Sequence, residues 1–316
     1  MKKNQIMFMS KKTKAIIGIT FLVLLTIALF YYLYIYSVGS AVLDPKGLVA
    51  LKERDLMYIA TILMLIVIVP VLIMTFAISY RYRATNKDAE YMPNWNHDTM
   101  AECIWWGFPL LIIIFLSFVT WKSTHELDPY KPLGSGMQPL KVQVVALDWK
   151  WLFIYPEQNI ATVNYLQIPE QRSIHFEITA DAPMNSFWIP DLGGQIYAMP
   201  GMNTELYLIS HVVGVFRGSS ANFSGEGFAG MSFNVKASPK EEFENWVKEA
   251  QRSKKTLDLT SYKQLQKPSE YEPVAIYSLK KNDLYQYILH KYMMPEEQMD
   301  MHMKHDTHQS DAKRPL

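Results

Sequence analysis

The chain has 316 residues, of which 49% are hydrophobic, and it carries a formal net charge of +1 at pH 7. This length allows one or two domains, and the nearly neutral charge gives no electrostatic case for binding nucleic acid. Cys103 is the single cysteine, which excludes an intrachain disulfide and a multi-cysteine metal site. The sequence also lacks a glycine-rich phosphate loop and a recognisable nucleophile motif. Its longest uncharged runs all lie before residue 125.

The N-terminal segment has the pattern of a targeting or anchoring sequence. Five lysines in the first 14 residues precede an apolar run from Ala15 to about Val38. The core of a signal peptide usually has ~7–15 residues, whereas a membrane-spanning helix needs ~20. Residues 1–38 are therefore predicted to be a cleaved signal peptide or a retained anchor helix, and the length of the run favours retention.

Two further apolar runs predict a transmembrane helical hairpin within residues 39–125. Residues 39–55 are interpreted as a short polar link, and residues 56–79 form an uncharged run of bilayer length. The second predicted helix, residues 103–121, has tryptophans near both ends, as expected of anchors at the membrane interface. Several basic residues in the loop between the helices place that loop in the cytoplasm and the chain beyond residue 125 in the periplasm.

Residues 126–237 have the pattern of a small β-domain. The stretch 140–157 is long, aromatic and β-branched, and residues 173–179 alternate polar and apolar side chains, which is typical of a half-buried strand. Further strands are predicted at 204–210, 214–219 and 230–237. Closely spaced strands with Pro and Gly turns and no intervening helices favour an antiparallel sandwich or barrel.

Residues 238–293 are predicted to be a C-terminal helical region. Ser238 can cap a helix whose first turn accommodates Pro239, and residues 281–293 have a second amphipathic pattern. Residues 294–316 are polar and rich in Met and His, and disorder is the preferred interpretation. A weaker alternative is that the tail binds a metal through His302, His305 and His308.

Five stretches together resemble subunit II of cytochrome bo-type ubiquinol oxidases, in the haem–copper oxidase superfamily. They are LDPKG at 43–47, YRATNKDAEYMPNW at 82–95, DWKWLFIYPEQNIATVN at 148–164, MNSFWIPDLGGQIYAMPGM at 184–202 and PSEYEPV at 268–274. The resemblance implies an α+β protein of the bacterial inner membrane, with a cupredoxin-like periplasmic domain on a helical hairpin. It also implies a complex in which subunit I holds two haems and one copper, accompanied by small membrane subunits. Such a complex reduces oxygen to water with ubiquinol and moves protons across the membrane.

The resemblance also identifies positions where copper-bearing relatives hold a two-copper centre. Those relatives have a His near the start of the stretch Asp181–Met231 and a Cys-x-Glu-x-Cys-x-x-x-His-x-x-Met run at its end. The corresponding residues here are Asn185, Ser220, Asn222, Ser224, Phe228 and Met231. A copper pair needs thiolate and imidazole ligands, so only the thioether of Met231 remains suitable. The expectation is that this chain binds no cofactor and does not accept electrons from cytochrome c.

Two further sites follow from the resemblance and from local pattern. Trp149 and Trp151 begin an aromatic stretch whose odd-numbered residues share one face of a regular strand, and they are predicted to pack against subunit I. Glu102 lies at the cytoplasmic start of the last membrane helix. Its carboxylate either serves the positive end of the helix dipole or forms the entrance of a proton channel into subunit I, as the resemblance implies.

The combined expectation is a non-catalytic subunit of a proton-pumping ubiquinol oxidase, which meets lipid and ubiquinol through its complex. Two alternatives remain. One is subunit II of a cytochrome c oxidase that accepts electrons directly. The other is a stand-alone, membrane-anchored periplasmic cupredoxin that handles metal, for which the Met/His-rich tail is the support.

Overall fold

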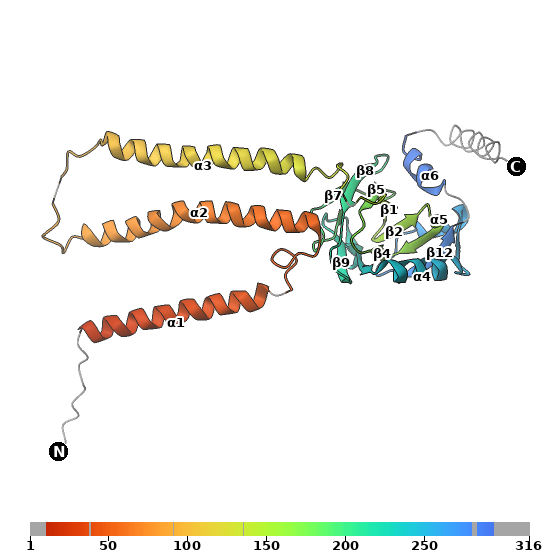
Figure 1. The fold of residues 1–316 in the computed structure, drawn as a ribbon, viewed down its shortest axis with the longest axis horizontal. Coiled ribbons are helices and arrows are strands. Elements are labelled where there is room, and N and C mark those ends of the chain that lie inside the picture. The colour runs from red at the N-terminus through yellow and green to blue at the C-terminus, as the bar shows by residue number, and fades with distance from the viewer. Residues whose placement is uncertain (1–10, 38, 91, 135, 280–282, 294–316) are drawn as a thin grey trace, which may run out of the picture. The chain divides into compact units, whose positions relative to one another are not determined.

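The computed structural model describes residues 11–37, 39–90, 92–134, 136–279 and 283–293. The chain divides into two compact units, Met1–Pro45 and Lys46–Leu316. In the first unit, α1 (Lys11–Ser37) is one continuous helix of 27 residues (Figure 1). A helix of this length suits a retained anchor as well as the precursor of a cleaved signal, so the fate of residues 1–38 stays a prediction.

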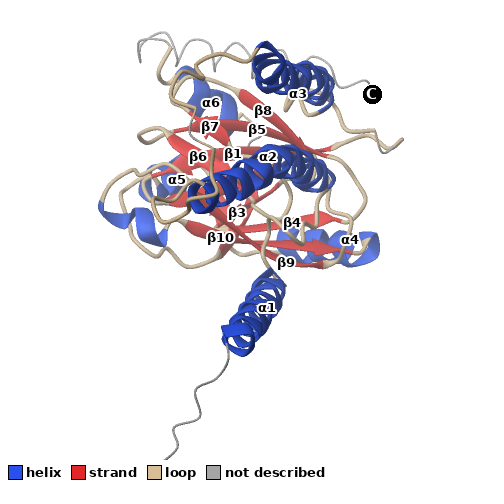
Figure 2. Cartoon of the chain, turned by 90° about the vertical axis from the view of Figure 1, so that its left-hand side faces the viewer, coloured by secondary structure: helices blue, strands red, loops and turns tan. Residues whose placement is uncertain are grey.

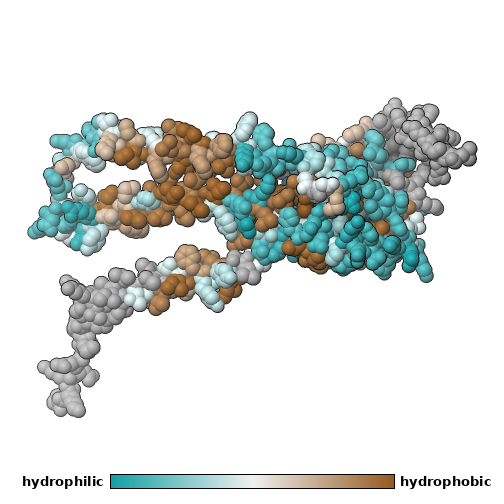
Figure 3. All heavy atoms as spheres, in the orientation of Figure 1, coloured by the Kyte–Doolittle hydropathy of each residue, from teal (hydrophilic) through white to brown (hydrophobic). Residues whose placement is uncertain are grey.

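The helical hairpin consists of α2 (Leu48–Arg81) and α3 (Thr99–Glu126), both long and apolar enough to cross a membrane. Their large apolar side chains are exposed along most of the length, as Figure 3 shows by colour. Both helices are longer than predicted. Residues 48–55, interpreted as part of a polar link, form the first two turns of α2. At the start of α3, the Asp98 carboxylate accepts a hydrogen bond from the Ala101 amide at 2.9 Å, which caps the helix.

The start of α2 is fixed to the β-domain by backbone hydrogen bonds. The amides of Lys46 and Gly47 donate to the Asp191 carbonyl at 2.8 and 2.9 Å, and the Ala50 amide donates to the Leu192 carbonyl at 3.2 Å. A β-carbon on Gly47 would lie 2.4 Å from the Leu192 oxygen, so only glycine permits this approach. The hairpin is therefore joined rigidly to the domain at this point.

The β-domain is a sandwich of two sheets (Figures 1 and 2). The larger sheet has the order β11-β12-β3-β2-β1-β5-β8, and the smaller has the order β4-β10-β9-β6-β7. The strands are β1 (Leu140–Leu147), β2 (Lys150–Tyr155), β3 (Ile160–Val163), β4 (Tyr165–Pro169), β5 (Ile174–Ala180), β6 (Asn185–Trp188), β7 (Ile196–Ala198), β8 (Thr204–Leu208), β9 (Gly214–Ser220), β10 (Ser232–Ser238), β11 (Thr256–Leu257) and β12 (Ala275–Leu279).

The predicted sandwich is confirmed, but its strands are not all antiparallel. The pairs β1–β5, β4–β10 and β11–β12 run parallel. Each of these pairs is joined through intervening strands or a helix, and connections of that length permit the parallel direction that a short hairpin turn forbids.

The predicted long strand at 140–157 is instead an antiparallel hairpin. Leu147 pairs with Lys150, so Asp148 and Trp149 form the turn between β1 and β2. Trp149 has φ +60°, a left-handed conformation that ends the strand. The prediction that Trp149 belongs to the same strand as Trp151 is therefore wrong.

Two hydrophobic cores lie on opposite faces of the larger sheet. The inner core, between the sheets, contains Trp151, Phe153, Phe187 and Phe233, whose ring centroids lie 5.0–6.3 Å apart in the contacting pairs. The second core is covered by α5 (Leu259–Leu265) and α6 (Leu284–His290). Neighbouring strand residues point to opposite faces, so both faces of β1 are buried.

The C-terminal region is part of this domain and is not a separate helical region. Its two short strands extend the larger sheet, where β12 pairs with β3, and α4 (Lys240–Gln251) contributes Phe243 to the inner core. Ser238 ends β10, and its hydroxyl accepts a hydrogen bond from Gln167 Nε2 at 3.1 Å, so it does not cap α4. The predicted metal-binding histidines of the tail, His302, His305 and His308, lie outside the described residues.

Candidate functional site

The six positions that correspond to copper ligands in the copper-bearing relatives, here called the copper frame, are Asn185, Ser220, Asn222, Ser224, Phe228 and Met231. The first two of these positions lie side by side. Asn185 begins β6 and Ser220 ends β9, two strands that are neighbours in the smaller sheet. The Ser220 hydroxyl donates to Asn185 Oδ1 at 2.8 Å, and the Asn185 amide donates to the Pro183 carbonyl at 2.7 Å. Asn185 is 1% exposed. The two side chains therefore satisfy each other in the place where the resemblance puts a first metal ligand and a thiolate.

The next two positions lie in the loop after β9. Asn222 Nδ2 donates to the Met184 carbonyl at 3.0 Å, which ties this loop to the segment before β6. The Ser224 carbonyl accepts from Trp149 Nε1 at 3.1 Å, while its buried hydroxyl has no hydrogen-bond partner within the described part of the chain. Ser224 thus lies beside the turn between β1 and β2, while Asn222 lies beside the segment before β6.

Phe228 and Met231 complete the frame with apolar groups. Phe228 lies in the short helix η1 (Glu226–Gly230), and its ring centroid is 5.5 Å from that of Phe223. Met231 is 1% exposed and belongs to the inner core of the sandwich. Its thioether therefore packs as an ordinary buried apolar group.

These six side chains do not form a ligand set for a copper pair. They offer amides, hydroxyls, a phenyl ring and one thioether, whereas a copper pair needs bridging thiolates and imidazoles. The Asn185 oxygen and the Ser220 hydroxyl are already bonded to each other. Among the described residues, no group of three or more His, Cys, Asp and Glu side chains is placed to hold a metal ion.

The two tryptophans of the predicted docking stretch have different surroundings. Trp151 is fully buried within the inner core, so its ring is not available to a partner subunit, and the docking prediction for Trp151 is wrong. Trp149 is half-buried at the turn between β1 and β2 and stays a candidate for contact with another subunit.

Glu102 lies in the first turn of α3, as predicted, beside a histidine that sequence reasoning did not connect with it. His97 Nδ1 and Glu102 Oε1 lie 2.6 Å apart, and Thr99 Oγ1 lies 3.2 Å from His97 Nε2. The Glu102 side chain is 37% exposed. His97 and Glu102 are five residues apart across the start of a helix, and this spacing is not a recognised motif, so the sequence did not predict their contact.

A buried carboxylate that the sequence did not single out fastens the C-terminal segment to the domain. Asp181 follows β5, and its carboxylate accepts hydrogen bonds from the phenols of Tyr262 and Tyr292 and from Lys291 Nζ at 2.7 Å. The Asp181 side chain is completely buried. Burial raises the pKa of Tyr262, and the charge of Asp181 raises it further, so this phenol remains a donor at neutral pH.

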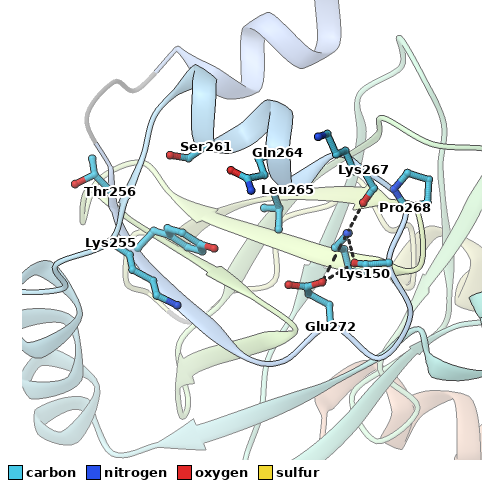
Figure 4. A pocket seen from close by; sticks show the side chains of 11 residues that line it. Lys150, Lys255, Thr256, Ser261, Gln264, Leu265, Lys267, Pro268 and Glu272 are labelled. Atoms are coloured by element: carbon cyan, nitrogen blue, oxygen red, sulfur yellow. Dashed lines mark hydrogen bonds and ion pairs between the residues drawn. The ribbon is translucent and has the colours of Figure 1, made fainter.

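A second polar anchor is Lys150, which lines an open pocket between β2, β12 and α5 (Figure 4). Its ammonium donates to the Lys267 carbonyl at 2.8 Å and to the Ser269 hydroxyl, and it lies 4.0 Å from the Glu272 carboxylate. Burial lowers the pKa of Lys150, while Glu272 opposes this shift. These bonds hold the loop 267–272 against the larger sheet.

Comparison with known proteins places the chain among respiratory oxidase subunits. Residues 156–238 match the family model described as "Cytochrome C oxidase subunit II, periplasmic domain", and residues 251–296 match "COX Aromatic Rich Motif". The chain is 54% identical to cytochrome bo(3) ubiquinol oxidase subunit 2 of Pseudomonas putida over 79% of this chain and 80% of that protein. It is 49% identical to the protein of the same name from Pseudomonas aeruginosa, over 79% and 75% of the two chains.

A more distant relative widens the comparison beyond ubiquinol oxidases. Quinol oxidase subunit 2 of Bacillus cereus is 42% identical over 72% of this chain and 79% of that protein. The hairpin, the sandwich and the C-terminal helices agree with these matches. The chain belongs to the family of subunit 2 of cytochrome bo(3)-type ubiquinol oxidases.

Proposed function

We propose that this chain is the non-catalytic subunit II of a proton-pumping terminal oxidase that reduces oxygen to water with ubiquinol. The observation that carries the proposal is the hydrogen bond between Ser220 and Asn185 at the first and second positions of the copper frame. Together with the apolar packing of Phe228 and Met231, it leaves no ligand set for a two-copper centre. Quinol delivers electrons within the membrane, so a complex that uses it needs no copper port for a soluble donor.

The partner in this proposal is a haem-bearing subunit I, which would hold two haems and one copper, together with small membrane subunits. The hairpin α2–α3 supplies the surface for it, since exposed apolar side chains cover both helices. Trp149, at the turn between β1 and β2, is the candidate contact from the β-domain. The role of the chain is to support subunit I and to cap its periplasmic face.

The proposed location is the bacterial inner membrane, with the β-domain in the periplasm. Arg81, Arg83 and Lys87 flank the loop between α2 and α3, and basic residues near a membrane favour its cytoplasmic side. Glu102 then lies at the cytoplasmic end of α3, and its contact with His97 supports the proposal that this residue forms the entrance of a proton channel.

Ubiquinol is preferred as the donor because relatives at 49% and 54% identity are named ubiquinol oxidase subunits. The alternatives are subunit II of a cytochrome c oxidase and a stand-alone cupredoxin that handles metal. The donor set at Asn185 and Ser220 argues against both, because each needs a metal centre in this domain.

Purification of the complex with a tag on this chain tests the proposal. The expected preparation contains a haem-bearing partner, oxidises ubiquinol, does not oxidise reduced cytochrome c, and holds one copper for each complex. Oxidation of reduced cytochrome c, or three coppers for each complex, would identify a cytochrome c oxidase. The absence of a haem-bearing partner would favour the stand-alone protein. The mass of the purified chain also decides whether residues 1–38 are retained.

A further inference from the structure

The pocket around Lys150, between β2, β12 and α5, is a polar site to which the proposed function gives no role (Figure 4). Its volume is about 700 Å³. Four of the residues that line it are charged, and five are neutral with a hydroxyl or amide group; Leu265 and Pro268 are the aliphatic members of the lining. A lining of this kind suits a polar ligand, because polar groups that leave water need hydrogen-bond partners.

The ammonium group of Lys150 has one hydrogen more than the protein satisfies. Lys150 is 1% exposed, and an ammonium group carries three donor hydrogens. Two of them go to the Lys267 carbonyl, at 2.8 Å, and to the Ser269 hydroxyl, while the Glu272 carboxylate lies 4.0 Å away, which is too far for a hydrogen bond. Among the described residues the third hydrogen therefore has no acceptor. Lysines this deeply buried are otherwise paired, so an acceptor on a bound ligand would complete the surroundings of this group.

Two further lysines line the pocket, and no acid neutralises them. Lys255 and Lys267 form no ion pair with any residue that the structure describes, and Figure 4 shows them on different sides of the pocket. With Lys150 they make three cations against the single carboxylate of Glu272, which leaves a net charge of +2 on the lining. The charge of Asp148 also acts on Lys150, but from the turn between β1 and β2, outside the lining. The pocket therefore favours an anion.

The neutral groups of the pocket are also without partners. The side chains of Ser261, Gln264 and Tyr277 make no hydrogen bond to another described residue. Burial raises the pKa of Tyr277, and the charge of Glu272 raises it further, so this phenol keeps its proton and can donate. Glu272 is bonded through Oε2, which accepts from the Ser269 hydroxyl at 2.5 Å. Its Oε1 is left to accept a hydrogen bond, so the pocket offers many donors and one strong acceptor.

We propose that this pocket binds a phosphate monoester of a small polyol. A phosphate monoester carries a charge of about −1.5 to −2 and three acceptor oxygens, which match the excess charge and the unpaired donors of the lining. Its hydroxyl groups donate to Glu272, which would only repel an inorganic phosphate ion. A carboxylate has two acceptor oxygens and leaves more of the donors unmatched. An acyl chain finds only Leu265 and Pro268 as aliphatic contacts. The inference goes beyond the proposed function and does not depend on it.

The test is calorimetric titration of the purified full-length protein in detergent with glycerol 3-phosphate, at constant ionic strength. Lys255→Gln should weaken binding roughly tenfold, because one hydrogen bond between charged groups is lost. Lys254→Gln is the matched control, since it removes the same charge from the neighbouring exposed residue, which does not line the pocket. Lys267→Gln and its control Lys263→Gln form a second pair of the same design. All four side chains are exposed, so the thermal midpoint should stay at the wild-type value and report intact folding.

Three further ligands separate the alternative occupants. Inorganic phosphate should bind roughly tenfold more weakly than glycerol 3-phosphate, because it makes no hydrogen bond to Glu272, and uncharged glycerol should show no saturable binding. Equal affinity for inorganic phosphate and glycerol 3-phosphate would overturn the assignment of a polyol. Tighter binding of dihexanoyl phosphatidic acid would overturn it by assigning the pocket to a lipid headgroup. The proposal also fails if glycerol 3-phosphate does not bind, or if Lys255→Gln and Lys254→Gln bind it equally.

Discussion

The indole ring of Trp149 lies against Gly227 so closely that a β-carbon on that glycine would be 2.5 Å from Trp149 Cδ2. The contact joins the turn between β1 and β2 to the loop that carries the copper-frame positions. Trp149 Nε1 also donates to the Ser224 carbonyl in this loop. The close packing of this tryptophan and this glycine therefore contributes to the shape of the loop.

Replacing Gly227 with alanine should destabilise the β-domain. The added methyl group overlaps the Trp149 ring, and overpacking of this kind typically costs about 1–3 kcal/mol. The thermal midpoint of the purified complex, followed by the near-ultraviolet signal of tryptophan, should fall. Gly134→Ala is the control because a β-carbon there meets nothing within 4 Å, so its midpoint should stay unchanged. Equal midpoints for both variants would contradict the close contact.

Asp181→Asn should release the C-terminal helix α6 from the domain. Asp181 accepts from Tyr262, Lys291 and Tyr292, and removal of one member of a buried charged network costs about 2–4 kcal/mol. Hydrogen exchange of the α6 amides should become faster, while exchange in β1 changes less. Asp283→Asn removes the same charge at the start of α6, where the side chain makes no capping bond, and should leave the exchange unaltered. Slow exchange in both variants would refute the role of Asp181.

The parts of the fold that could be predicted are those with a strong periodic signal. The uncharged runs of α2 and α3 and the alternation in β5 required only composition and period. The turn at Asp148 and Trp149 was missed because Asp148, a common turn residue, is followed by Trp149 where a two-residue hairpin turn usually has Gly, and the aromatic neighbours continue a strand pattern. Strand β12 was missed because its five residues are only half-buried and pair with β3, more than 100 residues earlier.

The candidate site, like the fold, could be predicted from the sequence only in part. Its positions could be named from the spacing of a known motif, but spacing does not show which side chains meet. Asn185 and Ser220 are 35 residues apart and touch because β6 and β9 are neighbours in the sheet. Asp181 and its three donors are 81–111 residues apart, so their network depends on the final packing of the C-terminal segment.

Lys150→Met should loosen the loop 267–272. The variant loses the bonds to the Lys267 carbonyl and the Ser269 hydroxyl, at about 1 kcal/mol for each hydrogen bond, so local opening should increase roughly tenfold or more. Limited cleavage after Glu270 by a glutamate-specific protease reports this opening directly. Lys141→Met is the control, because it removes a partly buried ion pair with Glu177 on the same sheet, away from the loop. A cleavage rate equal to that of the control would show that Lys150 does not hold the loop.

Asp148 should make the domain less stable as the pH rises above 3.8. Burial raises the pKa of this carboxyl from its ordinary value of 3.8, Lys150 opposes the shift, and Asp181 adds to it. Between the two pKa values the folded form keeps its proton and the unfolded form has lost it, so stability falls through that interval. Asp148→Asn removes this contribution. The difference in thermal midpoint between variant and wild type, measured from pH 4 upward, should grow in favour of the variant, and a constant difference would contradict the prediction.

Glu102→Gln should slow proton uptake by the assembled oxidase. The substitution keeps the size of the side chain and its contact with His97 but removes the group that can carry a proton at the proposed channel entrance. Proton uptake, followed with a pH indicator during a single reduction and oxidation cycle in vesicles, should be several-fold slower, and steady-state quinol oxidation should slow with it. Haem content reports assembly and should stay unchanged.

The matched control for this prediction is Glu90→Gln, which removes an exposed acid from the same loop without touching the start of α3. If Glu102 serves only the helix dipole, both variants should turn over at the wild-type rate, because an exposed charge at a helix N-terminus contributes only about 0.3–1 kcal/mol to stability. His97→Ala adds a second criterion. A proton entrance shared by His97 and Glu102 requires slower uptake in this variant too, whereas an isolated Glu102 entrance leaves its uptake at the wild-type rate.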